Sequence, residues 1–441
     1  MSPEVLTVFM FGGLLVGLFL GHPLAFVLGG VGVITALIGI GPHAFGLMIS
    51  RIHGNVMDNY ILVAVPLFIL MAQFLADSGV TDRMFKTLRL LMGGLRGGLT
   101  LAVVILSVLL AATTGIIGAS ITVIGMIAFA PMLRYGYDKR MSAGAIVAGG
   151  SLGVLIPPSI MLLIMASYSP VSVGQLFAGA ILPGLLLSGM YALYVLAMCY
   201  FRPELGPPMP EHERKGISSK TLFLALLSDV IPPVILILGV LGTIFAGIAT
   251  ATEAAAIGAF LAFCFVVIYG QFNVRTFFDA LYETGRVTSM VLFVVVGATA
   301  FTGVFTAGGG VNVIRDLIIG TGLPGWGIIL LILVIMFVLG MFLDWIGIVL
   351  LCFPIFIPIV QELGGNVLWF VVLSAVVLQT SFLTPPFGYA LFYLKGIAPL
   401  EITMEDIYIG SIPYVVLIVL AALIVAAFPQ LVLWLPSVML R

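Results

Sequence analysis

The chain has 441 residues, of which 62% are hydrophobic and only 8% are charged. Soluble domains carry about 25% charged residues, so this composition excludes a water-soluble globular protein. The formal net charge is −1, and because no basic surface is available to neutralise phosphates, the chain is not expected to bind nucleic acid. The composition predicts an all-α polytopic membrane protein that works within the lipid bilayer.

A helix needs about 20 mostly apolar residues to cross about 30 Å of hydrocarbon. The first such stretch carries Glu4 and no basic n-region, so we expect an uncleaved span there rather than a signal peptide. About ten stretches fit a full span, and they are 4–20, 23–40, 60–77, 142–168, 174–200, 228–247, 253–270, 288–306, 367–393 and 411–435.

Two further apolar stretches, 98–133 and 326–360, are each too long for one helix. Small and polar residues interrupt both midway, so each could form two spans or one re-entrant hairpin, and the interruption favours a hairpin. Basic residues flank both ends of 98–133, and basic residues mark cytoplasmic loops. Extending that assignment along the chain leaves only Arg51, Arg315 and Arg441 outside and predicts that both termini are outside.

The sequence contains a weak internal repeat. Pro158 and Pro386 are 228 residues apart, and the string IPPS around the first recurs as TPPF around the second. Each half holds five predicted crossings and one hairpin, and because five is odd, the second half should be inverted relative to the first. The predicted division is a first repeat over 1–200 (hairpin 98–133, broken helix 142–168), a cytoplasmic linker over 201–227, and a second repeat over 228–441 (hairpin 326–360, broken helix 367–393).

Each half also contains a double proline inside a predicted span. Two adjacent prolines remove two amide donors and disfavour the preceding helical turn, so these spans should unwind within the membrane. Freed carbonyls and nearby hydroxyls then form an oxygen-lined pocket that suits a small cation, while the half-helices that restart after each break direct positive N-terminal ends at an anion. A simple packing kink is the alternative for either proline pair alone.

No Lys or Arg occurs in 97–133, 141–201 or 316–394, the segments that would build this site. The charge of an anionic substrate would therefore be balanced by helix dipoles and by bound cations. This is a physical reason to expect sodium coupling, because a cation and an anion that enter together each reduce the desolvation cost of the other.

Two acidic residues have different expected roles. Asp344 lies at the tip of the second predicted hairpin, where burying a carboxylate costs about 2.5–3.5 kcal/mol. It could bind a cation, carry a coupled proton, or cap the following half-helix. Glu253 instead follows Thr250 at capping-box spacing, which predicts a structural role at the start of the span over 253–270.

The pattern G-x-S-x-G at 149–153 matches the nucleophile elbow of esterases. That motif requires a strand before it, a helix after it, and an acid and a histidine downstream. The only later histidine is His212, in the predicted linker. We therefore predict that the chain is not an enzyme.

Four segments carry a family resemblance, and they are GIIGASITVIGMIAFAPML (115–133), RYGYDKRMSAGAIVAGGSLGVLIPPSIML (134–162), GIATATEAAAIGAF (247–260) and LQTSFLTPPFGYALFYLKGIAP (378–399). They resemble the large permease subunit of TRAP (tripartite ATP-independent periplasmic) transporters, of the DctM and SiaM kind. The strings LDWIGIVLLCFPIFIPI and SFLTPPFG look closest to the branch associated with mannitol, chloroaromatic acids and 2-oxoacids.

The resemblance implies a sodium-driven importer of an organic acid anion in the bacterial inner membrane, where the orientation predicted from the basic residues puts both termini in the periplasm. It implies an elevator-type fold of the ion-transporter superfamily, in which the two hairpins and two broken helices form the moving domain. It also implies two partners: a small four-helix membrane subunit and a periplasmic substrate-binding protein that delivers the anion.

By resemblance, Na⁺ sites lie where each hairpin tip meets a broken helix. The candidate Na⁺ ligands are Thr113, Thr114, Gly115, Ser120, Ser151, Gly153, Gly340, Asp344, Thr380, Ser381 and Thr384. The candidate substrate-binding residues are Gly118, Ser120, Ser151, Pro157, Pro158, Ser159, Thr384, Pro385 and Pro386. The alternatives are a stand-alone sodium- or proton-coupled anion symporter that needs no binding protein, an ion channel, and an intramembrane enzyme.

Overall fold

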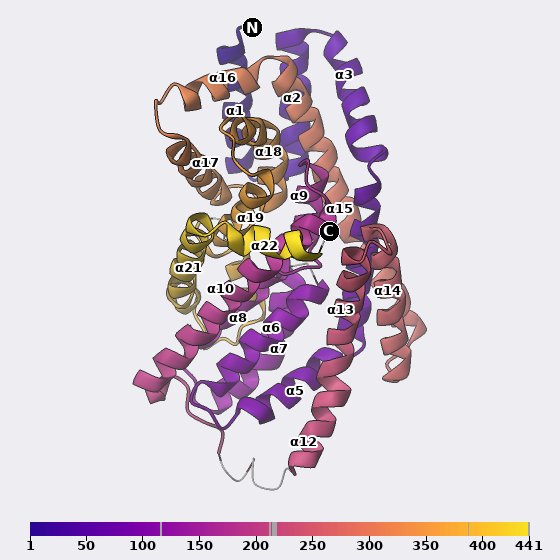
Figure 1. The fold of residues 1–441 in the computed structure, drawn as a ribbon, viewed down its shortest axis with the longest axis vertical. Helices are drawn as coiled ribbons and strands as arrows, with labels where there is room; N and C mark the ends of the chain where they lie inside the picture. The colour runs from indigo at the N-terminus through magenta and orange to yellow at the C-terminus, as the bar shows by residue number, and fades with distance from the viewer. Residues whose placement is uncertain (115–116, 211–212, 214–217, 387, 440–441) are drawn as a thin grey trace.

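The computed structural model (Figure 1) describes residues 1–110, 117–210, 213, 218–386 and 388–439, and the backbone alone over 111–114. Every regular element within these residues is a helix. Eight of the described helices or joined helices are long and apolar enough to cross a membrane, and shorter apolar helices of 10–17 residues accompany them. The predicted class, an all-α polytopic membrane protein, is confirmed.

The helices of the first half include the predicted spans and two helices, over 43–52 and 80–92, that were not predicted. They are α1 (Pro3–Phe19), α2 (Leu24–Thr35) continued by η1 (Ala36–Ile40), α3 (His43–Ile52), η2 (His53–Met57), η3 (Tyr60–Val63), α4 (Ala64–Asp77), α5 (Val80–Met92), α6 (Gly98–Thr114), α7 (Ile117–Arg134), α8 (Lys139–Ser151), η4 (Leu152–Val154), α9 (Ile160–Ser167), α10 (Val173–Phe201) and η5 (Pro203–Leu205).

The second half has a similar order of elements. Its helices are α12 (Ser219–Ala225), η6 (Leu226–Val230), α13 (Ile231–Phe245), α14 (Ala251–Ile268), α15 (Val274–Ala307), α16 (Gly310–Ile319), α17 (Gly325–Gly340), α18 (Trp345–Glu362), α19 (Val367–Leu383), α20 (Tyr389–Ile397), α21 (Met404–Ala427) and α22 (Gln430–Met439). Helix α18 begins and ends 228 residues after the corresponding ends of α7.

Some expected boundaries are wrong. The span predicted over 288–306 is the last part of α15, which begins four turns earlier at Val274 and includes four charged residues that hydropathy had excluded. The span predicted over 411–435 is two helices, because α21 ends at Ala427 and α22 begins at Gln430. Pro429 explains this break, since the residue before a proline avoids helical backbone angles, and Phe428 has a φ of −122°.

Capping boxes mark the starts of two helices of the second half. The Thr250 hydroxyl accepts a hydrogen bond from the Glu253 amide, and the Glu253 carboxylate accepts one from the Thr250 amide at 2.8 Å. This confirms the predicted capping box. A second box, formed by Thr403 and Asp406, starts α21 seven residues before the expected span. Acidic residues in a first helical turn are favourable, because the helix N-terminus carries partial positive charge, and they mislead a search for apolar runs.

The two interrupted stretches form two helical pairs in opposite halves of the molecule. Figure 1 shows α6 and α7 in the lower half and α17 and α18 in the upper half. Within each pair the helices contact each other, and each pair also packs on a broken helix: α6 and α7 on α8 and η4, α17 and α18 on α19. The inversion of one half relative to the other stays a prediction.

The segment predicted as a cytoplasmic linker lies against the base of the first helical pair. The amide of Gly97 donates to the Gly206 carbonyl at 2.8 Å, and the amide of Met209 donates to the Gly93 carbonyl at 2.8 Å. The Asp138 amide, just before α8, donates to Leu205 at 3.0 Å. The first part of this segment is therefore fixed to the hairpin base by backbone hydrogen bonds.

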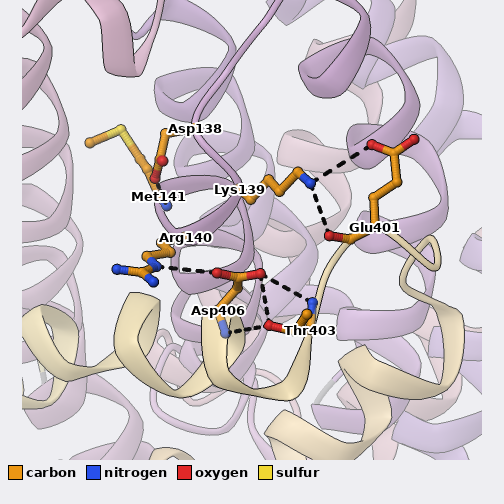
Figure 2. A network of polar contacts seen from close by, with 7 residues as sticks. All are labelled: Asp138, Lys139, Arg140, Met141, Glu401, Thr403 and Asp406. Atoms are coloured by element: carbon orange, nitrogen blue, oxygen red, sulfur yellow. Dashed lines mark hydrogen bonds and ion pairs between the residues drawn. The ribbon is translucent and has the colours of Figure 1, made fainter.

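The start of α8 is fixed to α21. Figure 2 shows Arg140 donating to the Asp406 carboxylate at 3.2 Å and Lys139 donating to the Glu401 carbonyl at 3.0 Å. One to two turns further along both helices, the two backbones approach each other so tightly that an ideal Cβ on Gly144 would stand 2.0 Å from the Gly410 carbonyl oxygen. Only glycine permits this contact.

Candidate functional site

A cavity of about 280 Å³ lies where the two helical pairs and the two broken helices meet. The first residues of four helices line it, and they are Ile117 and Gly118 of α7, Ile160 of α9, Trp345 and Ile346 of α18, and Tyr389 of α20. Helix α15 closes one side with Val287, Met290 and Val291. The elements that sequence analysis singled out are thus brought together at one place.

The electrostatics of this cavity come from the backbone. Each helix N-terminus carries unpaired amide groups and about half a positive charge, so four N-termini favour a negative ligand. Among the described residues that line the cavity there is no Lys or Arg, and Asp344 is the only charged one. An anion there would therefore lie near the N-terminal ends of four helices and near one carboxylate that must be neutralised or paired with a cation.

Asp344 has a structural role that the sequence placed third among its possibilities. It is the N-cap of α18, and its carboxylate accepts a hydrogen bond from the Trp345 amide at 2.8 Å. The Tyr389 side chain at the start of α20 lies close to the same carboxylate and lines the cavity with it. The residue therefore connects the second hairpin tip to the second broken helix while it faces the cavity.

The second hairpin tip also meets the broken helix at Gly340 and Ser381. An ideal Cβ on Gly340 would stand 1.9 Å from the Ser381 hydroxyl oxygen and 2.8 Å from the Ser381 Cβ. Ser381 and the neighbouring Gln379 are buried, and neither the Ser381 hydroxyl nor the Gln379 amide has a hydrogen-bond partner among the described residues. Such orphaned buried oxygens are the kind of group that a small cation satisfies.

The other candidates on α19 are already hydrogen-bonded within their own helix. The Thr380 hydroxyl donates to the Val377 carbonyl at 2.6 Å, and the Thr384 hydroxyl donates to the Thr380 carbonyl at 2.9 Å. Their oxygens can still accept or bind a cation through a remaining lone pair.

The first hairpin tip falls partly outside the described residues. Gly115 lies outside them, and for Thr113 and Thr114 the structure gives only the helical backbone of α6. Ser120 is buried within α7, and Gly153 lies in η4, which packs on α6 and α7. Ser151 is buried on α8, and its hydroxyl donates to the Ala148 carbonyl at 2.8 Å.

The two proline breaks differ in exposure. Pro157 and Pro158 are buried between η4 and α9, whereas Pro385 and Pro386 are exposed between α19 and α20. Ser159 caps α9: its hydroxyl accepts from the Leu162 amide at 3.3 Å and donates to the Val154 carbonyl. Of the proposed substrate residues, Gly118 lines the cavity itself, and its Cα faces the Tyr393 ring, 2.8 Å from an ideal Cβ.

Sequence reasoning did not identify the aromatic side chains of the site. Trp345, Tyr389 and Tyr393 line the cavity, and the two tyrosines stand one helical turn apart. The spacing of Tyr389 and Tyr393, one helical turn apart and directly after a proline break, could have indicated that they line the site. The contribution of α15 could not be read from the sequence, because its lining residues lie in an ordinary apolar span.

A cation site here would use neutral oxygens. Among the described residues, no group of three or more His, Cys, Asp or Glu lies close enough together to hold a metal. Hydroxyl, amide and carbonyl oxygens at the end of α17 and on α19 fit a monovalent hard cation better than a divalent ion, which usually takes more carboxylates.

Comparisons with known proteins agree with this architecture. A family model described as "Tripartite ATP-independent periplasmic transporter, DctM component" matches residues 11–431. The C4-dicarboxylate TRAP transporter large permease protein DctM of Pseudomonas aeruginosa is 31% identical over 385 residues, which cover 86% of this chain and 87% of that protein. The sialic acid TRAP transporter large permease protein SiaM of Vibrio cholerae is 29% identical over 385 residues, which cover 87% and 88%.

The fold has a match among solved structures. The crystal structure of the YdaH transporter of Alcanivorax borkumensis aligns over 98% of both chains with a TM-score of 0.61 and 15% sequence identity. At this identity the similarity concerns the fold alone.

Proposed function

The chain belongs to the family of the DctM component of tripartite ATP-independent periplasmic transporters, a family of transport permeases and not of enzymes, and from this premise we propose that it imports an organic acid anion driven by a sodium gradient. The anion binds in the cavity of about 280 Å³ between the two hairpins and the two broken helices. The assignment to the branch associated with mannitol, chloroaromatic acids and 2-oxoacids stays a prediction.

One observation carries the anion proposal: four helix N-termini line a cavity whose described lining contains no basic side chain. Backbone amides at helix N-termini bind carboxylates and phosphates without a cationic side chain. The relatives named above are permeases for a C4-dicarboxylate and for sialic acid, both organic acids. An organic acid carboxylate is therefore the ligand that this chain's cavity suits best.

Sodium supplies the missing positive charge. The Ser381 hydroxyl and the Gln379 amide are buried and have no partner among the described residues, and Ser381 lies next to the C-terminal end of α17 at Gly340. The C-terminal end of a helix carries partial negative charge and attracts cations. A Na⁺ held there, with Asp344 as a further negative group nearby in the chain, would lower the cost of bringing an anion into the cavity.

The proposed mechanism is an elevator-type movement of the two hairpins and two broken helices. Their packing on one another supports a single moving unit: α7 contacts α20 and α18 contacts α9, so each hairpin also holds the second part of the other half's broken helix. We propose a small four-helix membrane subunit and a periplasmic substrate-binding protein as partners. The proposed location is the bacterial inner membrane, with both termini in the periplasm.

Proton coupling is the second candidate. The observation in its favour is that the Asp344 carboxylate and the Tyr389 side chain both line the cavity. A carboxylate that faces an arriving anion can be neutralised by a proton as well as by a cation.

The fluorescence of Trp345 tests which ion accompanies the anion. The chain has four tryptophans, so a variant with Trp326, Trp369 and Trp434 changed to Phe reports from the cavity alone. We expect a panel of dicarboxylates and 2-oxoacids to change the emission in Na⁺ and not in K⁺. The same change in K⁺ at low pH would support the proton alternative, and no change with any member in either salt would overturn the assignment of the cavity.

A further inference from the structure

A second cavity, of about 540 Å³, lies between α5 and the hairpin helix α7. It shares no lining residue with the cavity between the hairpins among the residues that the structure describes. Helix α5 is amphipathic: Met84, Phe85 and Leu88 are buried, while Arg83 and Lys86 are exposed. Such a helix lies along the boundary between lipid and water, with its charged side toward the headgroups.

One wall of this cavity is basic. Lys86 and Arg89 line it one turn apart, and in the described part of the chain neither forms an ion pair within 4 Å. The Arg89 Nε and the Thr81 hydroxyl are buried there without a hydrogen-bond partner among described residues. Asp82 also lines the cavity and is exposed. Its single negative charge does not cancel the two positive charges, so the wall has a net positive charge. Two cationic side chains on one wall, without an ion-pair partner among the described residues, favour an anionic ligand.

The opposite wall is apolar. Helix α7 contributes Val123, Met126, Ile127 and Pro131, and the Met126 side chain is 60% exposed. A free inorganic anion would gain no binding free energy from this wall, because it has no apolar surface to bury. A ligand with both an anionic head and an acyl chain contacts both walls at once.

The second half of the molecule contains a corresponding cavity that no basic residue lines among the described residues. A cavity of about 330 Å³ between α16 and α18 is lined by Ile314 and Leu317, which stand 228 residues after Lys86 and Arg89. The basic residue next to these two, Arg315, forms an ion pair with Glu362 of α18 at 2.6 Å. Packing an amphipathic helix against a hairpin helix therefore does not by itself produce a basic cavity.

We propose that an anionic phospholipid binds in the cavity between α5 and α7, with its phosphate on Lys86 and Arg89 and an acyl chain along Val123 and Met126. Basic pockets between membrane helices on the cytoplasmic side bind anionic headgroups, and the predicted orientation places α5 on that side. Helix α5 is itself anchored, because the Thr87 hydroxyl donates to Asp229 of η6 at 2.7 Å. The lipid therefore bridges this anchored helix and the first hairpin.

The test is native mass spectrometry of the full chain titrated with phosphatidylglycerol or phosphatidylethanolamine. Wild type should retain one phosphatidylglycerol in preference to phosphatidylethanolamine. Because a basic residue near an anionic lipid contributes about 1 kcal/mol, Lys86→Gln should weaken this binding about fivefold, and Lys86→Gln with Arg89→Gln about thirtyfold. Arg96→Gln removes an exposed charge that does not line the cavity and should change nothing.

Further measurements test the role of charge, the folding of the variants and the need for an acyl chain. Arg89→Lys keeps the charge and should retain most of the binding, and equal unfolding midpoints in phosphatidylethanolamine alone would show that the glutamine variants fold. Inorganic phosphate and glycerol 3-phosphate should not displace the lipid. The proposal would be overturned if the two lipids bound equally, or if the Lys86→Gln with Arg89→Gln variant bound phosphatidylglycerol as tightly as the wild type. Displacement of the lipid by free phosphate would also overturn it.

Discussion

Asp344 combines two tasks that can be separated by mutation. Its carboxylate caps α18 through the Trp345 amide, and it is also the single charged group on the described lining of the cavity between the hairpins. Asparagine keeps an oxygen that can accept from the same amide but removes the charge. Alanine removes both.

We expect Asp344→Asn to fold normally and to need at least about tenfold more sodium for half-maximal uptake, because the negative charge near the proposed sodium site is replaced by a weaker dipole. Asp344→Ala should show the same loss and in addition unfold more easily by about 1 kcal/mol, the typical value of an N-cap. Sodium-dependent uptake and unfolding of the purified protein would measure the two effects.

Glu253→Gln is a matched control, because Glu253 also supports a helix start but is exposed and does not line the cavity. It should leave the sodium dependence unchanged. An Asp344→Asn variant with the sodium dependence of the wild type would remove Asp344 from the proposed coupling site. A variant that transports equally well without sodium but has lost its dependence on pH would favour the proton alternative.

Gly340 marks the contact between the second hairpin tip and α19. Alanine there would overlap both the hydroxyl and the Cβ of Ser381, so rotation of the serine cannot relieve the contact. We expect Gly340→Ala to cost about 1–3 kcal/mol of stability and to abolish most uptake, because the added methyl group would push the second hairpin tip away from α19 at the proposed sodium site. Gly327→Ala in the same helix meets atoms no closer than 3.4 Å and should be tolerated. Equal uptake by the two variants would contradict this account of the tip.

At the scale of elements, α8 is joined to α21 by close backbone packing and by surface charges. The Gly144 Cα faces the Gly410 carbonyl, and the Gly410 Cα faces the Arg140 carbonyl, with ideal Cβ atoms 2.0 and 2.1 Å away. The Arg140 side chain, about half exposed, forms the ion pair with Asp406 shown in Figure 2. The relative weight of these two contacts can be predicted from their burial.

Gly144→Ala should destabilise the protein by about 1–3 kcal/mol, because two helix backbones would be forced apart. Arg140→Gln should cost less than about 1 kcal/mol, because solvent-exposed ion pairs contribute little. Denaturant unfolding in detergent compares them, with Gly189→Ala as the control, since a Cβ there meets nothing within 4 Å. A larger effect of Arg140→Gln than of Gly144→Ala would show that charge, and not packing, holds α8 to α21.

The sequence predicted most of the elements and missed those that are not apolar. Composition and apolar runs placed the long helices and the interruptions at the hairpin tips and proline breaks. Amphipathic α5 and α16 were not expected, because their charged faces lower the mean hydropathy of the segment. Charged residues also lie in the first part of α15 and in the first turn of α21. For this reason the predicted span was shorter than α15, and the predicted start of α21 lay after its capping box.

At the scale of the whole molecule, the candidate site depends on tertiary packing. Motifs in the sequence pointed to the backbone breaks, and the structure brings the helix starts at Ile117, Ile160, Trp345 and Tyr389 to one cavity. The side chains of α15 and the pairing of Asp344 with Tyr389 join segments far apart in the chain, so no local pattern could reveal them. The repeat, its inversion and the membrane orientation stay predictions.

Coupled uptake tests the proposed function of the whole molecule most directly. Proteoliposomes would hold this chain with its candidate small subunit, and uptake of labelled dicarboxylates and 2-oxoacids would be measured with and without a periplasmic binding protein and an inward sodium gradient. We predict uptake only when both are present, and loss of that uptake in Asp344→Asn at limiting sodium. Uptake that proceeds without the binding protein or without sodium would contradict the account and favour a stand-alone or proton-driven symporter.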